Sequence, residues 1–318
     1  MKRLVWVVTL ILLLALGVMN VWMINYIAEL KQEYAKYRGV LVFKNANSRD
    51  TIFSMHNISK AHEITRGKGI KVGIIDRYFG YEKHPDLYAG GSNFSEDDRS
   101  FLSLDEHGYW MALTLSEVAP EAEIYALNID FAIADETKKV DSMIKAINWA
   151  IENDLDVLTY SSSSFSEENE QRLNETVEKA IDNDIVTTFI HYYYEKNLLP
   201  DGLFTYKGSM DYNRREPDLN IFHYDYSVLM LPQYYEYLSN NQIDAERLTF
   251  LSISSTSPVT AGFVALLKSI NNDLKVSDYK EILRDTSKEM YYEGQYCPRV
   301  VDIYEALQYL ARLSSESN

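Results

Sequence analysis

Three separated segments decide the fold of this chain: Gly73-Ile-Ile-Asp76, Asp105-Glu-His107-Gly108 and Ser252-Ile-Ser254-Ser-Thr-Ser-Pro258-Val-Thr-Ala-Gly262. The first places an acid at the end of an apolar strand, the second a histidine before a glycine, and the third a serine just ahead of a helix. An acid, a histidine and a serine are the parts of a nucleophilic triad. Their order along the chain is Asp, His, Ser, which differs from the order in chymotrypsin and in the α/β-hydrolases.

Strand and helix patterns alternate around these segments. Short apolar runs predict strands at residues 70–75, 123–129, 156–160 and 185–190. Helical periodicity is present at residues 111–118, 140–151, 173–181, 257–270, 277–286 and 303–313. Strands separated by helices predict an α/β fold with a doubly wound, mainly parallel sheet and helices on both faces. Residues 194–250 are rich in tyrosine and have no readable pattern.

The composition excludes several classes of function. The formal net charge of the 318 residues is −16, which disfavours a nucleic-acid partner because phosphate binding needs clustered Lys and Arg. Acidity of this kind serves solubility or attracts basic substrates. Cys297 is the single cysteine, so no internal disulfide can form. Neither paired CxxC motifs nor HExxH occurs, and we expect no metal or other cofactor in catalysis.

The N-terminus predicts a membrane segment. Met1-Lys2-Arg3 precedes an uncharged stretch, residues 4–24, which as a helix would extend about 30 Å. A cleavable signal peptide, cut near Ala15-Leu16-Gly17, is the alternative. We expect an uncleaved single-pass anchor, with most of the chain on the extracytoplasmic side of the membrane. The resulting division is an anchor or signal peptide at 1–25, a juxtamembrane helix and lead-in segment at 26–60, and a catalytic domain at 61–318.

The chain resembles the subtilisin-like serine proteases, or subtilases, from about residue 61 to residue 310. Their acid motif is followed by His-Pro-Asp-Leu, which is present here as His84-Pro85-Asp86-Leu87. Their histidine motif begins His-Gly and is followed by Ala-Pro, as in His107-Gly108 and Ala119-Pro120. Counting back from Pro258 and Gly262 in their serine motif makes Ser254 the equivalent of the nucleophile.

The resemblance implies a membrane-anchored endopeptidase that hydrolyses peptide bonds through an acyl-enzyme. Asp76 would orient His107, and His107 would act as general base and then general acid for Ser254. The residues after the strand at 156–160 would line the cleft for a peptide or protein substrate: Ser161, Ser162 and Ser163. The sequence leaves the oligomeric state open.

The chain also departs from the family pattern beside these residues. The family's oxyanion Asn would fall near Tyr193, with His191 close by, so one of these two is the candidate donor. The glycines that follow the acid and precede the serine are missing, and the lead-in is too short for a folding propeptide. A degenerate subtilase fold acting as a peptide-binding or scaffolding module at the membrane is therefore the alternative. The acidic run Glu96-Asp97-Asp98 would suit either structural calcium or a solvated loop.

Overall fold

The structure is a computed structural model in which the described residues all belong to one of two compact units, residues 48–318. The described ranges are 53–130, 135–161, 166–191, 204–208, 220–222, 227–229, 253–292 and 295–316. The predicted membrane segment at 1–25 and the juxtamembrane helix lie outside them. Within these ranges, no helix combines the length and the apolar character needed to cross a membrane.

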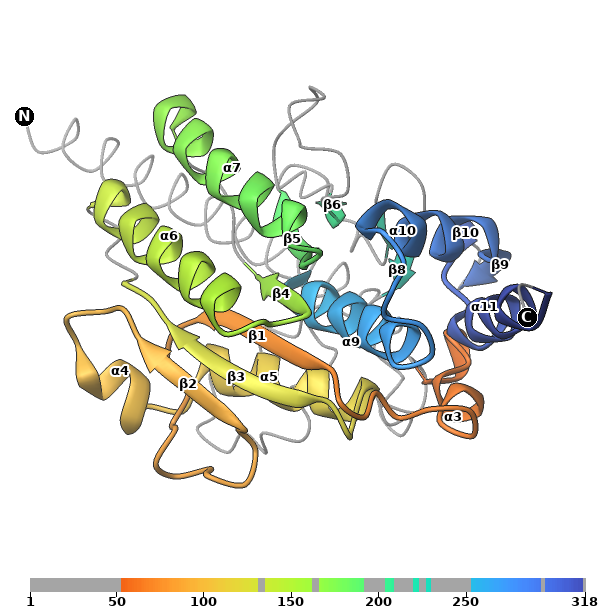
Figure 1. The fold of residues 1–318 in the computed structure, drawn as a ribbon, viewed down its shortest axis with the longest axis horizontal. Helices are drawn as coiled ribbons and strands as arrows, with labels where there is room; N and C mark the ends of the chain where they lie inside the picture. Colours follow the sequence, from red (N-terminus) through yellow and green to blue (C-terminus); the bar gives the residue numbers. More distant parts are fainter. Residues whose placement is uncertain are drawn as a thin grey trace, which may run out of the picture. The chain divides into compact units, whose positions relative to one another are not determined.

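The core of the unit is a mainly parallel sheet (Figure 1). Its strand order is β2-β3-β1-β4-β5-β6-β7-β8-β10-β9. The strands are β1 (Lys71–Asp76), β2 (Gly90–Asn93), β3 (Glu123–Asn128), β4 (Val157–Tyr160), β5 (Val186–His191), β6 (Phe204–Gly208), β7 (Asn220–Phe222), β8 (Ser227–Leu229), β9 (Lys288–Tyr292) and β10 (Gln295–Val300). The neighbours from β2 to β6 pair in parallel, whereas β7 and β9 pair only in the antiparallel sense.

Helices cover both faces of the sheet, because alternate residues of the central strands point to opposite sides. The helices are α3 (Ile58–Ala61), α4 (Asp98–Leu102), α5 (His107–Val118), α6 (Glu136–Glu152), α7 (Glu167–Asp182), α9 (Thr256–Lys268), α10 (Val276–Asp285) and α11 (Ile303–Glu316), with a 3₁₀ turn, η2 (Ile253–Ser255). On β1, Ile74 belongs to the apolar core under α5 and α9. Its neighbour Ile75 belongs to the core under α6 and α7.

The predicted mainly parallel sheet with helices is confirmed, and the four predicted strands are β1, β3, β4 and β5. The helix expected at 111–118 begins four residues earlier, at His107 itself. Residues 194–250 contain the short strands β6, β7 and β8. Strands of three to five residues contain too few alternating positions to produce a recognisable period, so they could not be predicted from the sequence.

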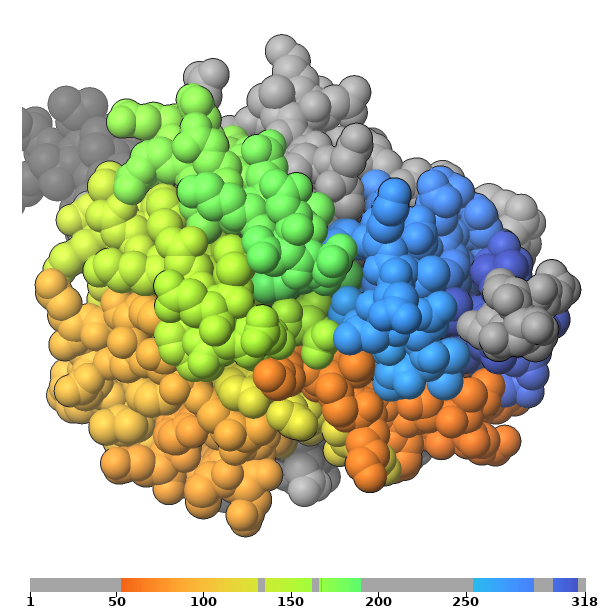
Figure 2. All heavy atoms as spheres, viewed as in Figure 1, coloured from red at the N-terminus to blue at the C-terminus, as the bar shows by residue number. Residues whose placement is uncertain are grey.

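The end of the lead-in segment is part of the same core. Phe53, Met55 and Ile58 are buried, although they precede the boundary at residue 61 that the sequence suggested. His56 lies within 2.7 Å of the Val301 carbonyl oxygen through Nδ1, and the Ile303 N–H donates to the His56 carbonyl. Figure 2 shows residues near 53–70, in orange, against the blue C-terminal part of the chain. The two ends of the described unit thus close on each other.

Helix α5 begins with the candidate histidine, and helix α9 follows the candidate serine. The two helices cross at Gly262. A Cβ atom added at this position would lie 2.6 Å from Val118 Cγ1 and 2.7 Å from Val118 Cβ. Real side chains do not approach so closely, so only glycine permits this spacing of the two helices. The relative placement of the candidate site residues depends on that crossing.

We therefore expect Gly262→Ala to lower the free energy of unfolding by about 1–3 kcal/mol, because overpacking forces the two helices apart. Helix propensity alone predicts the opposite sign, since Ala stabilises a helix by about 1 kcal/mol relative to Gly. Chemical denaturation of the two proteins decides between these effects. A variant as stable as the parent would show that the two helices can move apart without a loss of stability.

Candidate active site

Asp76 and His107 form a hydrogen-bonded pair at the carboxyl end of the sheet. Asp76 is the last residue of β1 and is buried, whereas His107 is the first residue of α5 and a third of its side chain is exposed. His107 Nδ1 donates to Asp76 Oδ2 at 2.8 Å. The other carboxylate oxygen, Oδ1, accepts the Arg77 N–H at 2.8 Å. With its proton on Nδ1, the imidazole has Nε2 available as a base.

The backbone after Asp76 fixes the start of α5. Arg77 O accepts the Gly108 N–H at 2.8 Å, and Tyr78 O accepts the N–H groups of Glu106 at 2.9 Å and Tyr109 at 3.2 Å. The first N–H groups of a helix lack intrahelical partners, and no side chain caps α5. The carbonyls of the acid loop take that role, which locks the helix of His107 to the strand of Asp76.

This contact depends on a close approach of the backbone at Gly108 and on a positive φ at Tyr78. A Cβ atom at Gly108 would lie 2.6 Å from Arg77 O, so the glycine after the histidine is needed for the close approach. Tyr78 has φ of +65°, in the left-handed region. The acid motif of the resembling family has glycine at this place. Tyrosine therefore adopts a left-handed conformation at a position where that family has glycine, which the sequence indicated only as a missing glycine.

Two side-chain contacts involve residues close in sequence to Asp76 and His107. The Arg77 guanidinium carbon lies 4.7 Å from the centroid of the Tyr78 ring. The His84 ring stacks on that of Tyr109, in the first turn of α5, with 3.9 Å between centroids. Asp105 accepts from Lys83 Nζ at 2.6 Å and lies 3.2 Å from His84 Nε2. These contacts hold the residues on either side of His107 in place.

The electrostatics of His107 reflect opposing effects. Burial of the ring lowers the pKa of His107, but the charge of Asp76 and the hydrogen bond to it outweigh burial, so the pKa is raised above its ordinary value. The nearby charge of Arg77 lowers the pKa, and that of Glu106 raises it. A histidine whose pKa is raised in this way is a stronger base than a free imidazole.

Ser254 lies in η2, immediately before α9, and only 9% of the residue is exposed. Helix α5 contacts both η2 and α9. The buried Ser161, just after β4, donates through Oγ to the Ser254 carbonyl oxygen at 2.9 Å. No hydrogen bond joins the Ser254 and His107 side chains, both of which are described. In enzymes without substrate, such contacts are often long and tighten only when substrate binds.

A second hydroxyl secures the start of α9. Ser257 Oγ lies 2.7 Å from Thr159 Oγ1 and donates to Tyr160 O at 3.1 Å. Together with the contact of Ser161, this holds the segment that bears Ser254 against the carboxyl end of β4. Of the other predicted site residues, Ser162, Ser163 and Tyr193 lie outside the described residues. His191 ends β5, and its side chain lies outside the description.

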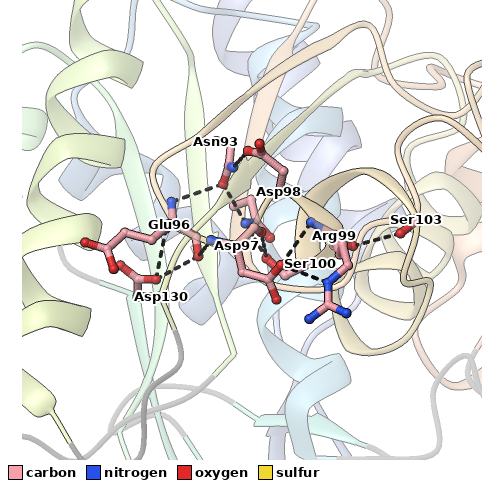
Figure 3. A network of polar contacts seen from close by, with 10 residues as sticks. Asn93, Glu96, Asp97, Asp98, Arg99, Ser100, Ser103 and Asp130 are labelled. Atoms are coloured by element: carbon pink, nitrogen blue, oxygen red, sulfur yellow. Dashed lines mark hydrogen bonds and ion pairs between the residues drawn. The ribbon is translucent and has the colours of Figure 1, made fainter.

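The acidic run at 96–98 belongs to a network of polar contacts (Figure 3). Asp97 Oδ1 accepts the Arg99 N–H at 3.1 Å and caps α4. Asp98 accepts from Asn93 Nδ2 at 2.7 Å, and Glu96 pairs with Lys138. Among the described residues, no three His, Cys, Asp or Glu side chains gather in a way that could hold a metal ion. The carboxylates of the run all have partners from the protein itself.

Comparisons with known proteins agree with this architecture. Residues 67–191 match the subtilase family of peptidases. A crystal structure of a lanthipeptide protease is 17% identical, with a TM-score of 0.56, and the match covers 85% of this chain and 97% of that one. A protease of Pseudoalteromonas arctica is 13% identical, with a TM-score of 0.57, over 80% and 94% of the two chains. MycP1 of Mycobacterium smegmatis is 12% identical, with a TM-score of 0.52, and the match covers 80% of this chain and 83% of that one.

No curated protein matches the sequence. At these identities the similar structures show the fold. Together with the family match, they confirm that the chain resembles the subtilases.

The left-handed conformation of Tyr78 predicts an unusual order of stability. Tyr78→Gly and Tyr78→Ala both remove the ring, but only Ala retains the penalty of a Cβ atom at positive φ, about 1 kcal/mol. We expect the Gly variant to have the higher free energy of unfolding, as measured by denaturant titration. Equal stability of the two variants would mean that this loop is not held at positive φ.

The Asp76–His107 pair predicts a pH dependence of stability. A raised pKa in the folded state stabilises the protein fully below the unfolded value, about 6.5, and this stabilisation is lost as the pH rises through the folded pKa. Asp76→Asn removes the charge, and burial then dominates, so we expect the pKa of His107 to fall below its ordinary value and this pH dependence to reverse. NMR titration of the His107 ring and unfolding curves between about pH 5 and 9 would measure both.

Asp105→Asn is the matched control, because Asp105 contacts Lys83 and His84 and not His107. Its His107 titration should match that of the parent. An Asp76→Asn variant with an unshifted His107 would contradict the ion pair.

Proposed function

We propose that this divergent subtilase is a serine endopeptidase in which Asp76, His107 and Ser254 form the catalytic triad. The observation that carries the proposal is the 2.8 Å bond from His107 Nδ1 to the buried Asp76 carboxylate. It leaves Nε2 as the base, on a helix that contacts the turn of Ser254. The family match and the similarity to solved proteases support the same reaction class.

In the proposed reaction, Ser254 Oγ attacks the carbonyl carbon of the peptide bond, and its proton moves to His107 Nε2. The C–N bond then breaks, and His107 returns the proton to the leaving amine. This leaves an acyl group as an ester on Ser254. Water, deprotonated by the same nitrogen, hydrolyses the ester and regenerates the serine. Asp76 stabilises the imidazolium in both steps without accepting its proton.

We also propose that turnover is slow or narrowly selective. Without the Asn of the family, the developing oxyanion would have the Ser254 N–H and a donor supplied by Tyr193 or His191. Loss of one such donor lowers turnover by about 10²–10³-fold; the value comes from subtilisin itself. We further propose that residues 161–163 form an edge of the substrate cleft. An N-terminal anchor would hold the domain at the membrane, outside the cell. A lanthipeptide protease among the similar structures favours a peptide substrate.

A fluorophosphonate probe tests the proposal, because it reacts only with a serine that a base has activated. We expect the purified protein to be labelled and Ser254→Ala to be unlabelled. Ser255→Ala is the matched control: its hydroxyl is buried and has no hydrogen-bond partner. Removing an unpaired hydroxyl is neutral or stabilising, so this variant should fold and be labelled like the parent.

Absence of labelling in a folded parent protein would contradict catalysis. The alternative, a peptide-binding module with the subtilase fold, would then become the working hypothesis. Labelling that persists in Ser254→Ala would instead place the nucleophile at another serine.

A further inference from the structure

A half-buried lysine lies near the end of β4, the strand beside that of Asp76, on the opposite face of the sheet from α5. Lys139 belongs to the first turn of α6, and α6 contacts β1. Its ammonium nitrogen lies 5.6 Å from the centroid of the Tyr160 ring, at the end of β4. In the sheet register Tyr160 pairs with Ile75, the residue before Asp76. The ammonium therefore lies over the carboxyl ends of the strands that position Asp76.

We propose that Lys139 is a positioning residue for the Asp76–His107 pair, whose ammonium offsets part of the negative charge that Asp76 presents to the imidazole. The inference rests on the proposed function, in which His107 must be neutral before it can take the serine proton. A strong, uncompensated carboxylate would keep the imidazole protonated at neutral pH. A cation behind the carboxylate leaves the hydrogen bond intact and moderates its effect.

The charged groups around Lys139 agree with this arrangement. Burial lowers the pKa of Lys139 to about 8, while the charge of Asp76 acts in the opposite direction. Arg77 lowers the pKa of Lys139, and Glu136, on its own helix, raises it. Lys139 and Asp76 therefore interact electrostatically, and Arg77 is a second cation near both.

The neighbouring Lys138 is a matched control. It lies on the same turn of α6, is exposed, and pairs with Glu96 in the acidic loop. Lys138→Met changes the net charge of the protein and the composition of the helix by the same amount as Lys139→Met. A difference between the two variants thus reports the position of the ammonium and not the loss of a lysine.

The experiment is an NMR titration of the His107 ring, which requires no substrate and no turnover. We expect Lys139→Met to raise the pKa of His107 by about one unit, because a nearby positive charge is removed. Lys139→Arg, which keeps the charge, and Lys138→Met should each leave it within about 0.2 units of the parent. An unshifted His107 in folded Lys139→Met would overturn the proposal, as would an equal shift in Lys138→Met.

A second measurement covers the case in which Lys139→Met does not fold. In Asp76→Asn, the pKa of Lys139, followed through its side-chain nitrogen, should fall below its value in the parent, since the interaction is reciprocal. An unchanged value would overturn the proposal. Both titrations are independent of probe labelling. A protein that fails to react with the probe can still show the coupling, so the two proposals fail separately.

Discussion

The structure depends on the hydrogen bonds between the acid loop and the first turn of α5. Arg77 and Tyr78 offer their carbonyl oxygens to the free N–H groups of that turn. The strand that ends in Asp76 and the helix that begins with His107 are thereby one rigid piece. The distance between the two side chains is set by main-chain geometry. Long side chains at positions 77 and 78 can therefore change without displacing the pair.

The same principle explains how the fold tolerates lost glycines. Gly108 and Gly262 remain where backbone or a neighbouring helix leaves no room for a Cβ atom. At position 78 only the dihedral angle is demanding, and tyrosine meets it at a moderate energetic cost. A position with no room for a Cβ atom therefore requires glycine, whereas a position that needs only a positive φ can accept another residue. The absence of a motif glycine is weak evidence that the local backbone has changed.

Much of the architecture could be predicted from sequence because buried parallel strands are continuous apolar runs, as in β1 and β5. The pairing of Asp76 with His107 was predicted from motifs of a resembling family, and the structure supplies its distance. Two features could not be predicted. The proposed role of Lys139 depends on the packing of α6 against β1. A lysine in an amphipathic helix is normally expected on the solvent-exposed face. The contribution of Phe53, Met55 and Ile58 to the core could not be predicted, because three apolar positions in a short segment have no distinct period.

The closure between the two ends of the described unit limits how the chain can be processed. Residues 53–61 share one apolar core with α9 and α11. Cleavage upstream of Phe53 would leave the described residues of that core on one continuous chain. Cleavage between Ala61 and Lys71 would remove a wall of the core and expose the buried face of α9, the helix that follows Ser254. Trimming of the N-terminus is therefore compatible with this fold only if it stops before the buried residues of 53–61.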